Sequence, residues 1–489
     1  MKSSWIVCLL IGLNFPSISN STNSKKNVRP NIVILIADDI SRDDFGCYGH
    51  PVIKTPNIDR LSKGGIKFTN AFLTASSCSP SRSSIITGRY PHNTGACELH
   101  APLAKNQVAF PLLLKQAGYY TAQAGKWHFG ESKVSGVAVS AFNRTGGSSA
   151  DGGGPSGAEM WVPYLKERPK ERPFFMWFAA HDAHRGWDKK NTFNYSPENV
   201  IVPDYMVDNH QTRKDLAAYY KEVSRFDYYV GKVIDELKQQ KVLDNTLVIV
   251  MADNGRPFPR DKTRLYDSGI ITPFIVHFPK EIETTNQVCE SLLSVIDIAP
   301  TITELAGVKP SEMFQGKSFR TLLHHPDKEF RDYVFAEHNW HDYKAYERMV
   351  RTKQFLYIEN GLPEQANIGA ADVLNGGAGK ALLMGMQKQC LNEIQKKPFL
   401  IPQPQVELYN CIDDPNQFKN IAGQEDSKSI QKKLKRILSQ WQRKTKDTQP
   451  KQLTPDWYDR KTMKPLKCKG QRGIMPGSEK KAEEVKTKE

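Results

Sequence analysis

The chain of 489 residues lacks the motifs of several large protein classes. It has no zinc-finger spacing of cysteine and histidine, no aromatic-basic RNA-binding motif and no Gly-Lys-Ser phosphate loop. Beyond the leader, no stretch approaches the roughly 18 apolar residues that a membrane-spanning helix needs. We therefore expect neither nucleic-acid binding, nor P-loop nucleotide hydrolysis, nor a transmembrane anchor.

Cysteine is scarce, with eight residues in the whole chain. Cys8 lies in a leader whose Lys2, apolar run over 5–13 and small residues before position 20 are typical of a secretory signal peptide. Apart from Cys8 and one further cysteine treated below, six remain; they allow many pairings, so no disulfide is predicted. We expect residues 1–20 to be a signal peptide and the protein to be exported: periplasmic or secreted in a bacterium, lysosomal in a eukaryote.

Acidic residues are outnumbered by basic ones, and the formal net charge is +15. This charge is compatible with nucleic-acid binding, with attraction to a polyanionic substrate or with a merely solvated surface. Export argues against a nucleic-acid partner and leaves the other two alternatives open. Residues 471–489 are rich in lysine and glutamate and almost without apolar side chains, so we predict a disordered tail there.

Three short apolar runs, at 32–36, 174–178 and 246–251, are typical of buried strands. Polar side chains follow each run at once, namely Asp38 and Asp39, then His181 to Arg185, then Asp253 and Asn254. Because ligands gather at the carboxyl ends of strands in an α/β sheet, we expect these groups to converge.

Helical patterns alternate with these strands, for example over 56–63 and over 215–238. This alternation predicts one large α/β domain over residues 25–330. Shorter strand-like runs follow, and with a helical stretch near 429–441 they predict a smaller α+β domain over residues 331–470. Between the strands, the Gly- and Ser-rich segment 143–157 is predicted to be a loop.

The polar groups at the strand ends predict a metal site. Asp38, Asp39 and Asp253 supply three carboxylates, and Asn254 adds an amide oxygen. Such hard oxygen ligands suit Ca²⁺ or Mg²⁺ far better than zinc. An Asp-Asp pair after a strand is by itself more typical of a turn or a helix cap, so the prediction depends on the neighbouring motifs.

The most informative motif is Cys78-Ser79-Pro80-Ser81-Arg82. Pro80 suits the first turn of a helix, and the helix can continue to Gly88. Cys78 then lies at the anion-attracting N-terminus, and Arg82 adds a fixed cation one turn later. This stretch resembles the signature that sulfatase-maturing enzymes read when they oxidise a cysteine to formylglycine.

Further motifs, in chain order, are similar to those of the sulfatase family. They are Ala37-Asp38-Asp39, the stretch from Cys78 to Arg89, Gly125-Lys126-Trp127-His128, His181, Asp253-Asn254-Gly255, Lys262, and late in the chain Glu407 to Asn410 with Asp414-Pro415. The resemblance spans about residues 29–425. It implies an alkaline-phosphatase-like α/β fold: a large central mixed β-sheet flanked by helices, with a smaller C-terminal α+β domain.

The resemblance also implies a cofactor and its ligands. Residue 78 is implied to be 3-oxoalanine (formylglycine), made by a formylglycine-generating or an anaerobic sulfatase-maturing enzyme. One Ca²⁺ per chain, with Mg²⁺ the weaker alternative, is implied to be bound by Asp38, Asp39, Cys78, Asp253 and Asn254. A hydroxyl of the hydrated aldehyde then attacks the sulfur of the substrate.

The remaining roles come from the same resemblance. Arg82, Lys126 and Lys262 are implied to offset charge at the reacting centre, His181 to be the general acid, and His128 the base that regenerates the aldehyde. Taken one at a time, most of these residues are more typical of a structural role, whereas the whole set favours the catalytic roles. Lys262 is flanked by two arginines, at 260 and 264, and a shift of register exchanges it for one of them.

The segments 181–185 and 253–259 are most similar to the sulfamidase and polysaccharide sulfatase branch, although Ala183 stands where proline is commoner in the family. We expect hydrolysis of sulfate groups from a sulfated polysaccharide or its oligosaccharides, with an algal polysaccharide such as ulvan favoured. Alternatives are an N-sulfoglucosamine sulfohydrolase, a phosphohydrolase or phosphonate hydrolase of the same fold, and an inactive glycan-binding protein. Candidate sugar contacts are His100, His184, Arg185, His338, Trp340 and His341.

Overall fold

The computed structural model describes Met1 and residues 29–130, 136–148 and 154–478. Its largest element is an eight-stranded mixed sheet with the strand order β5-β4-β6-β1-β7-β8-β2-β9. The strand β8 runs antiparallel to both neighbours, and every other adjacent pair is parallel. The strands are β1 (Asn31–Ala37), β2 (Ile66–Phe68), β4 (Tyr120–Gly125), β5 (Arg144–Gly146), β6 (Phe174–Ala179), β7 (Thr246–Ala252), β8 (Phe274–His277) and β9 (Gln287–Cys289).

Helices cover both faces of this sheet because successive side chains of a strand point to opposite sides. On β1, Ile32, Ile34 and Ile36 pack against one helical layer, while Val33 and Leu35 pack against the other. The first layer contains α2 (Cys78–Thr87), α3 (Phe110–Gln116), α4 (Val137–Ser140) and α8 (Ile298–Leu305), and the second contains α1 (Pro56–Lys63), α5 (Trp161–Glu167) and α6 (His210–Gln239).

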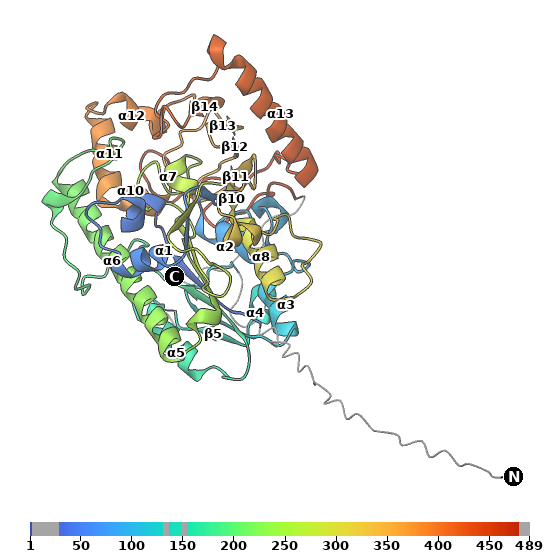
Figure 1. The fold of residues 1–489 in the computed structure, drawn as a ribbon. Coiled ribbons are helices and arrows are strands. Elements are labelled where there is room, and N and C mark those ends of the chain that lie inside the picture. The colour runs from blue at the N-terminus through green and yellow to red at the C-terminus, as the bar shows by residue number, and fades with distance from the viewer. Residues whose placement is uncertain (2–28, 131–135, 149–153, 479–489) are drawn as a thin grey trace.

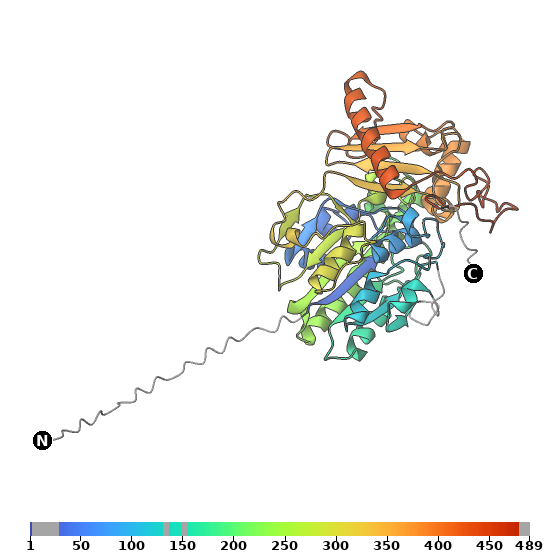
Figure 2. The same cartoon turned by 90° about the vertical axis from the view of Figure 1, so that its right-hand side faces the viewer.

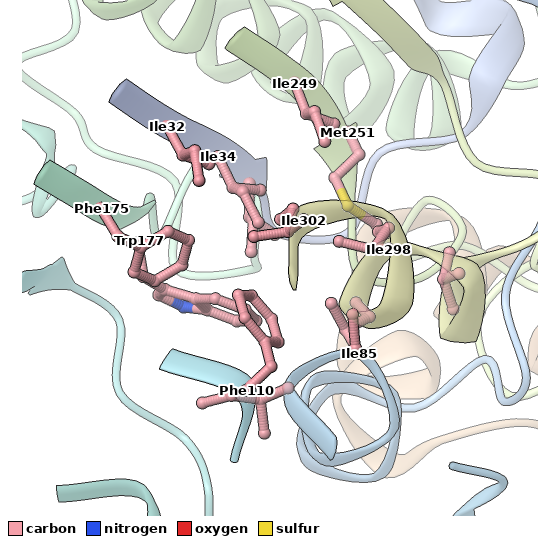
Figure 3. Close-up of a cluster of buried hydrophobic side chains, with 14 of the residues drawn as sticks. Ile32, Ile34, Ile85, Phe110, Phe175, Trp177, Ile249, Met251, Ile298 and Ile302 are labelled. Atoms are coloured by element: carbon pink, nitrogen blue, oxygen red, sulfur yellow. The ribbon is translucent and has the colours of Figure 1, made fainter. Parts of the chain in front are cut away.

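Figure 3 shows the first layer from close by. Ile34 of β1 and Met251 of β7 face Ile298 and Ile302 of α8, and Ile85 of α2 lies beside them. Burial of apolar surface contributes about 25 cal/mol of stability for each Å², and this contribution holds α2 against the sheet. The position of α2 matters because its first residue is Cys78.

A second unit lies on top of the first (Figure 2). It is a four-stranded antiparallel sheet of β11 (Val334–His338), β12 (Glu347–Arg351), β13 (Phe355–Asn360) and β14 (Val406–Asn410), covered by α13 (Lys428–Thr445). Between β13 and β14 the chain forms α10 (Ala371–Asn375), α11 (Gly377–Gln387) and α12 (Glu393–Lys396). Short elements complete the fold: α7 (Asp267–Ile270), α9 (Thr321–His324), and the paired strands β3 (Ala71–Phe72) and β10 (Leu293–Ser294).

The fold class is therefore the expected one. The three predicted apolar strands are β1, β6 and β7, and the two predicted helices correspond to α1 and α6. Within the predicted loop 143–157, residues 144–146 instead form the edge strand β5. Among the described residues, no helix has both the length and the apolar character of a membrane span.

The predicted disordered tail is wrong for residues 471–478. Met475 is 5% exposed in the main core, and Arg472 forms an ion pair with the buried Glu98. Met475 and Arg472 anchor this segment to the rest of the protein. Most of the other residues around them are small or polar, so the composition alone predicted disorder. Residues 479–489, and all of the predicted signal peptide except Met1, lie outside the described residues. The seven described cysteines are all free thiols.

Candidate active site

Four adjacent parallel strands end at the same edge of the large sheet. In their register Gly125 of β4 pairs with Ala179 of β6, and Ala37 of β1 pairs with Ala252 of β7. The residues that follow are Lys126 after β4, His181 after β6, Asp38 and Asp39 after β1, and Asp253 and Asn254 after β7. Segments that are distant in sequence therefore supply one polar cluster, as the sequence predicted.

Cys78 enters this cluster from the N-terminus of α2. The helix spans Cys78–Thr87, has Pro80 in its first turn and ends at Gly88, whose φ of 63° is the left-handed conformation that glycine tolerates. Every residue of α2 is buried. The thiol Sγ lies 3.8 Å from Asp39 Oδ1, so the helix start and the end of β1 meet.

The acidic groups at the strand ends form a compact and fully buried cluster. The Asp39 backbone N–H donates to Asp253 Oδ1 at 3.2 Å. Asp38, Asp39 and Cys78 offer ligand atoms within 4.8 Å of one another. Asp38 Oδ1 and Asn254 Oδ1 are buried without a hydrogen bond in the described part of the chain. Oxygens crowded together in this way fit a hard divalent cation.

Three cations surround the acidic cluster. Arg82 Nε donates to Asp253 Oδ2 at 2.8 Å, Lys262 Nζ to Asp39 Oδ2 at 2.9 Å, and Lys126 Nζ to Asp38. Burial by itself lowers the pKa of both lysines, but the carboxylates outweigh it, so the pKa of each is raised and both are charged. Burial likewise favours the neutral form of Asp39, yet Lys262 holds its pKa below the ordinary value.

The lysine at 262, rather than a flanking arginine, reaches the cluster. Arg260 stacks on Tyr266 with its guanidinium 3.8 Å from the ring centroid. Arg264 points to Asn367 and lies 4.0 Å from Glu347. The sequence did not decide among Arg260, Lys262 and Arg264. In the structure Lys262 is the one of the three that contacts Asp39.

The histidines follow a different pattern. His128 Nε2 lies 2.8 Å from His100 Nδ1, and burial lowers the pKa of both rings, to about 4 for His100 and well below the ordinary value for His128. His184 also has a pKa lowered to about 4 by burial and by Lys262. His181 is half-buried directly after β6, and the loop residue Gly157 packs so closely that a Cβ there would lie 3.0 Å from His181 Cδ2.

Asp372 of α10 belongs to this site and carried no motif in the sequence. Its Oδ2 accepts from Lys262 Nζ at 2.8 Å and lies 3.6 Å from His184 Nε2. Lys262 therefore bridges Asp39 and Asp372. The pKa of Asp372 is lowered, because Lys262 and His184 outweigh its burial.

Two of the predicted sugar contacts, Trp340 and His338, are buried and bind other residues of the protein. Trp340 is 3% exposed, with its ring 4.4 Å from that of Trp457 and its Nε1 donating to Pro455 O. His338 bonds Glu347 at 2.7 Å. These positions do not fit sugar stacking, because neither side chain faces solvent.

Two more predicted contacts lie closer to the site. His341 Nδ1 is 2.7 Å from the hydroxyl of Ser77, the residue before the thiol, and His341 itself is 5% exposed. Arg185 makes a bidentate pair with Asp215 at 2.9 Å for both bonds. Among the six predicted sugar contacts, His184 is one whose side chain reaches solvent. It lies at the rim of the polar cluster and is 35% exposed.

Comparison with known proteins agrees with this geometry. The sulfatase family matches residues 30–308, and the N-sulphoglucosamine sulphohydrolase C-terminal family matches residues 258–360. Two ulvan-active sulfatases of Formosa agariphila are 27% and 30% identical, over 86% and 84% of this chain and 76% and 80% of their own lengths. Human N-sulphoglucosamine sulphohydrolase is 34% identical over 56% of this chain and 60% of its own length.

Solved structures share the fold. One, a complex with its substrate D-glucosamine-2-N,6-O-disulfate, has a TM-score of 0.64 at 20% identity and covers 85% of this chain and 98% of that one. A complex with a neocarrahexaose has a TM-score of 0.63 at 21% identity, covering 85% and 93%. The family match extends over more than half of the chain and includes the polar edge of the sheet. The chain belongs to the sulfatase family and is a sulfuric ester hydrolase.

Proposed function

We propose that this chain is an exported, Ca²⁺-dependent sulfatase that releases sulfate from a sulfated polysaccharide or its oligosaccharides. The observation that carries the proposal is the meeting of Cys78, at the N-terminus of α2, with the buried carboxylates of Asp38, Asp39 and Asp253. A thiol held there is placed for conversion to formylglycine, whose hydrated aldehyde supplies the attacking hydroxyl.

Asp38, Asp39, Asp253, Asn254 and residue 78 itself would hold the metal ion. Bound Ca²⁺ supplies Lewis-acid chemistry, since it polarises sulfate oxygens and lowers the pKa of a nearby hydroxyl. Asp38 Oδ1 and Asn254 Oδ1, which are buried and accept no hydrogen bond from a described residue, are suitable oxygen ligands for such an ion.

The chain's own cations orient and stabilise the sulfate. Lys126, Lys262 and Arg82 are held by carboxylates in a water-poor site, so their charges are fixed before substrate arrives. Negative charge that develops on the sulfate oxygens in the transition state then meets prearranged donors.

Two histidines handle protons. We assign His181, which is half-buried after β6, the role of protonating the leaving oxygen or nitrogen. His128 has a pKa lowered well below the usual value by burial and by Lys126, so its ring is neutral and can accept a proton. The proton it accepts comes from the remaining hydroxyl of residue 78 when sulfate leaves.

The proposed substrate class rests on the relatives. Ulvan-active sulfatases match along most of the chain, and solved structures of the same fold hold a disulfated glucosamine and a carrageenan-type hexaose. The net charge of +15 suits a polyanionic chain of this kind.

N-sulfate hydrolysis is the second candidate. The match of residues 258–360 to the N-sulphoglucosamine sulphohydrolase C-terminal family and the 34% identity to the human enzyme favour it. The sulfate-binding groups serve both reactions, so the sugar-facing residues decide between them.

Sulfate release from a panel of ulvan, carrageenan, fucoidan, heparan and chondroitin oligosaccharides tests the proposal. We expect one substrate class to be desulfated by the wild type, with the position assigned by NMR, and no release by Cys78→Ala. Faster turnover of aryl phosphate than of aryl sulfate would instead favour a phosphohydrolase of the same fold.

A further inference from the structure

A pocket of about 720 Å³ opens beside the proposed active site. It lies where residues 185–189, the first half of α6 and the junction of α10 with α11 meet. Figure 1 shows α10 and α11, in orange, beside the green helix α6. At that junction Gly377 is so close to α6 that a Cβ there would lie 2.9 Å from Asp215 Cβ. The pocket is therefore formed by packed elements and not by one loose loop.

A chain of three contacts connects this pocket to the thiol. Cys78 Sγ lies 3.8 Å from Asp39, Asp39 lies 2.9 Å from Lys262, and Lys262 lies 2.8 Å from Asp372. Asp372 is also part of the pocket wall. Its side chain is 27% exposed, whereas those of Asp39 and Lys262 are buried. Asp372 therefore connects the buried centre with the pocket.

The carboxylates of the pocket wall already have partners. Asp215 is paired with Arg185, both Asp188 and Glu222 with Arg225, and Asp372 with Lys262. Lys189 and Lys221 also line the pocket, and neither forms an ion pair with any residue that the structure describes. Lys189 and Lys221 are therefore the cations of the pocket that are available to pair with an anionic ligand.

An aromatic ring completes the pocket. Trp187 donates its indole N–H to Asp215 at 2.9 Å, and its ring packs edge-on to Tyr219 at 6.0 Å. These contacts fix the indole while leaving it half-buried in the pocket wall. A fixed aromatic face is a good platform for a sugar ring.

We propose that this pocket binds the acidic sugar residue next to the one that carries the scissile sulfate, with Trp187 packing on its ring and Lys189 and Lys221 receiving its carboxylate or sulfate group. The inference rests on the proposed sulfatase function. Asp372, at the rim, accepts hydrogen bonds from hydroxyl or amine groups of the sulfated sugar, because a carboxylate can only accept them.

The test compares two substrates in the full-length, formylglycine-containing enzyme. One is 4-nitrocatechol sulfate, which is too small to reach the pocket, and the other is the oligosaccharide that the wild type desulfates best. For the double variant Lys189→Gln/Lys221→Gln we expect the ratio of kcat/KM on oligosaccharide to kcat/KM on aryl sulfate to fall about tenfold. Lys214→Gln/Lys238→Gln, which changes two exposed lysines of the same helix α6, should keep the wild-type ratio.

Modified oligosaccharides identify the anion. Carboxyl reduction should lower the wild-type kcat/KM by a similar factor if the group is a uronate, and removal of the non-scissile sulfates should do so if it is a sulfate. A Lys189/Lys221 variant that keeps the wild-type ratio, with unchanged thermal unfolding, overturns the inference. Wild-type enzyme that carries formylglycine and hydrolyses neither substrate overturns the proposed function itself, which is a different result.

Discussion

His128 Nε2 and His100 Nδ1 lie 2.8 Å apart, and this contact joins the end of β4 to the segment after Cys97. Both residues have positive φ, 47° for His128 and 64° for His100. The two segments touch so closely that a Cβ on Gly130 would lie 2.1 Å from Ala101 O. His100 also donates its backbone N–H to Ser79 Oγ, beside the proposed nucleophile. His100 therefore holds the ring of the proposed base in place relative to residue 78.

Replacing His100 by asparagine should lower kcat about tenfold while KM changes little, because His128 loses the partner that orients its ring. Asparagine tolerates the left-handed backbone at this position, so the segment should keep its path. Steady-state kinetics on aryl sulfate measure the effect. His325→Asn, an exposed histidine, is the matched control. A variant with unchanged kcat contradicts the positioning role.

Metal removal should cost both activity and stability. Without a cation the buried carboxylates of Asp38, Asp39 and Asp253 repel one another. At Ca²⁺ about 100 times its Kd the ion adds about 2.7 kcal/mol to the free energy of unfolding, so chelation should lower Tm by several degrees. Differential scanning calorimetry with EDTA, then with added Ca²⁺ or Mg²⁺, measures this, and Ca²⁺ should restore more.

The variant Asp38→Asn provides the control for that experiment, since it removes one ligand charge. Its Tm should respond less to Ca²⁺ than the Tm of the wild type. Full activity of the wild type after exhaustive chelation contradicts the metal assignment.

Trp340 should behave as a core residue. Arg472 lies with its guanidinium 4.3 Å from the Trp340 ring and 4.6 Å from the Trp457 ring, so the C-terminal segment closes over this tryptophan. Trp340→Ala should lower the free energy of unfolding by about 3–5 kcal/mol in urea titrations. A large rise in KM for oligosaccharide with unchanged stability would restore the sugar-contact prediction.

Glu98 should contribute a loss of stability as the pH rises. Burial raises the pKa of this carboxyl to about 7, although Thr454 and Arg472 both hydrogen-bond its Oε2. The folded chain therefore binds this proton more tightly than the unfolded chain, in which the pKa of the carboxyl is 4.5. As the pH rises from about 4.5 to about 7, the contribution of Glu98 to the free energy of unfolding decreases.

Glu98→Gln removes that proton uptake, so the change in its Tm from about pH 5 to about pH 8 should be less negative, or more positive, than the change in the wild-type Tm. Thermal unfolding followed by circular dichroism in a buffer series measures the slopes. The exposed Glu312→Gln should keep the wild-type slope. Equal slopes for Glu98→Gln and wild type show that Glu98 does not titrate in this window.

Local signals made much of the site predictable. The apolar runs of β1 and β7 with their polar ends, and the proline and glycine that bound α2, each depend on a few neighbouring residues. Parallel strands then bring those ends together by geometry alone. The convergence of Asp38, Asp39 and Asp253 needed no further information.

The remaining features depend on long-range packing. Asp372 reaches Lys262 only because α10 packs beside the site, and no motif in its segment indicates this. Trp340 was predicted to bind sugar because an aromatic residue among histidines is typical of such surfaces, but Trp457 and Arg472 arrive from more than 100 residues later and bury it. Met475 fills the main core in the same way.

The mass of the peptide that contains residue 78, taken from an enzyme preparation of known specific activity, shows whether Cys78 is converted to formylglycine. If formylglycine is the nucleophile, this peptide has lost sulfur and gained an aldehyde that reacts with a hydrazide, in a fraction that rises in step with activity. A fully active preparation in which Cys78 remains a thiol contradicts this role of formylglycine.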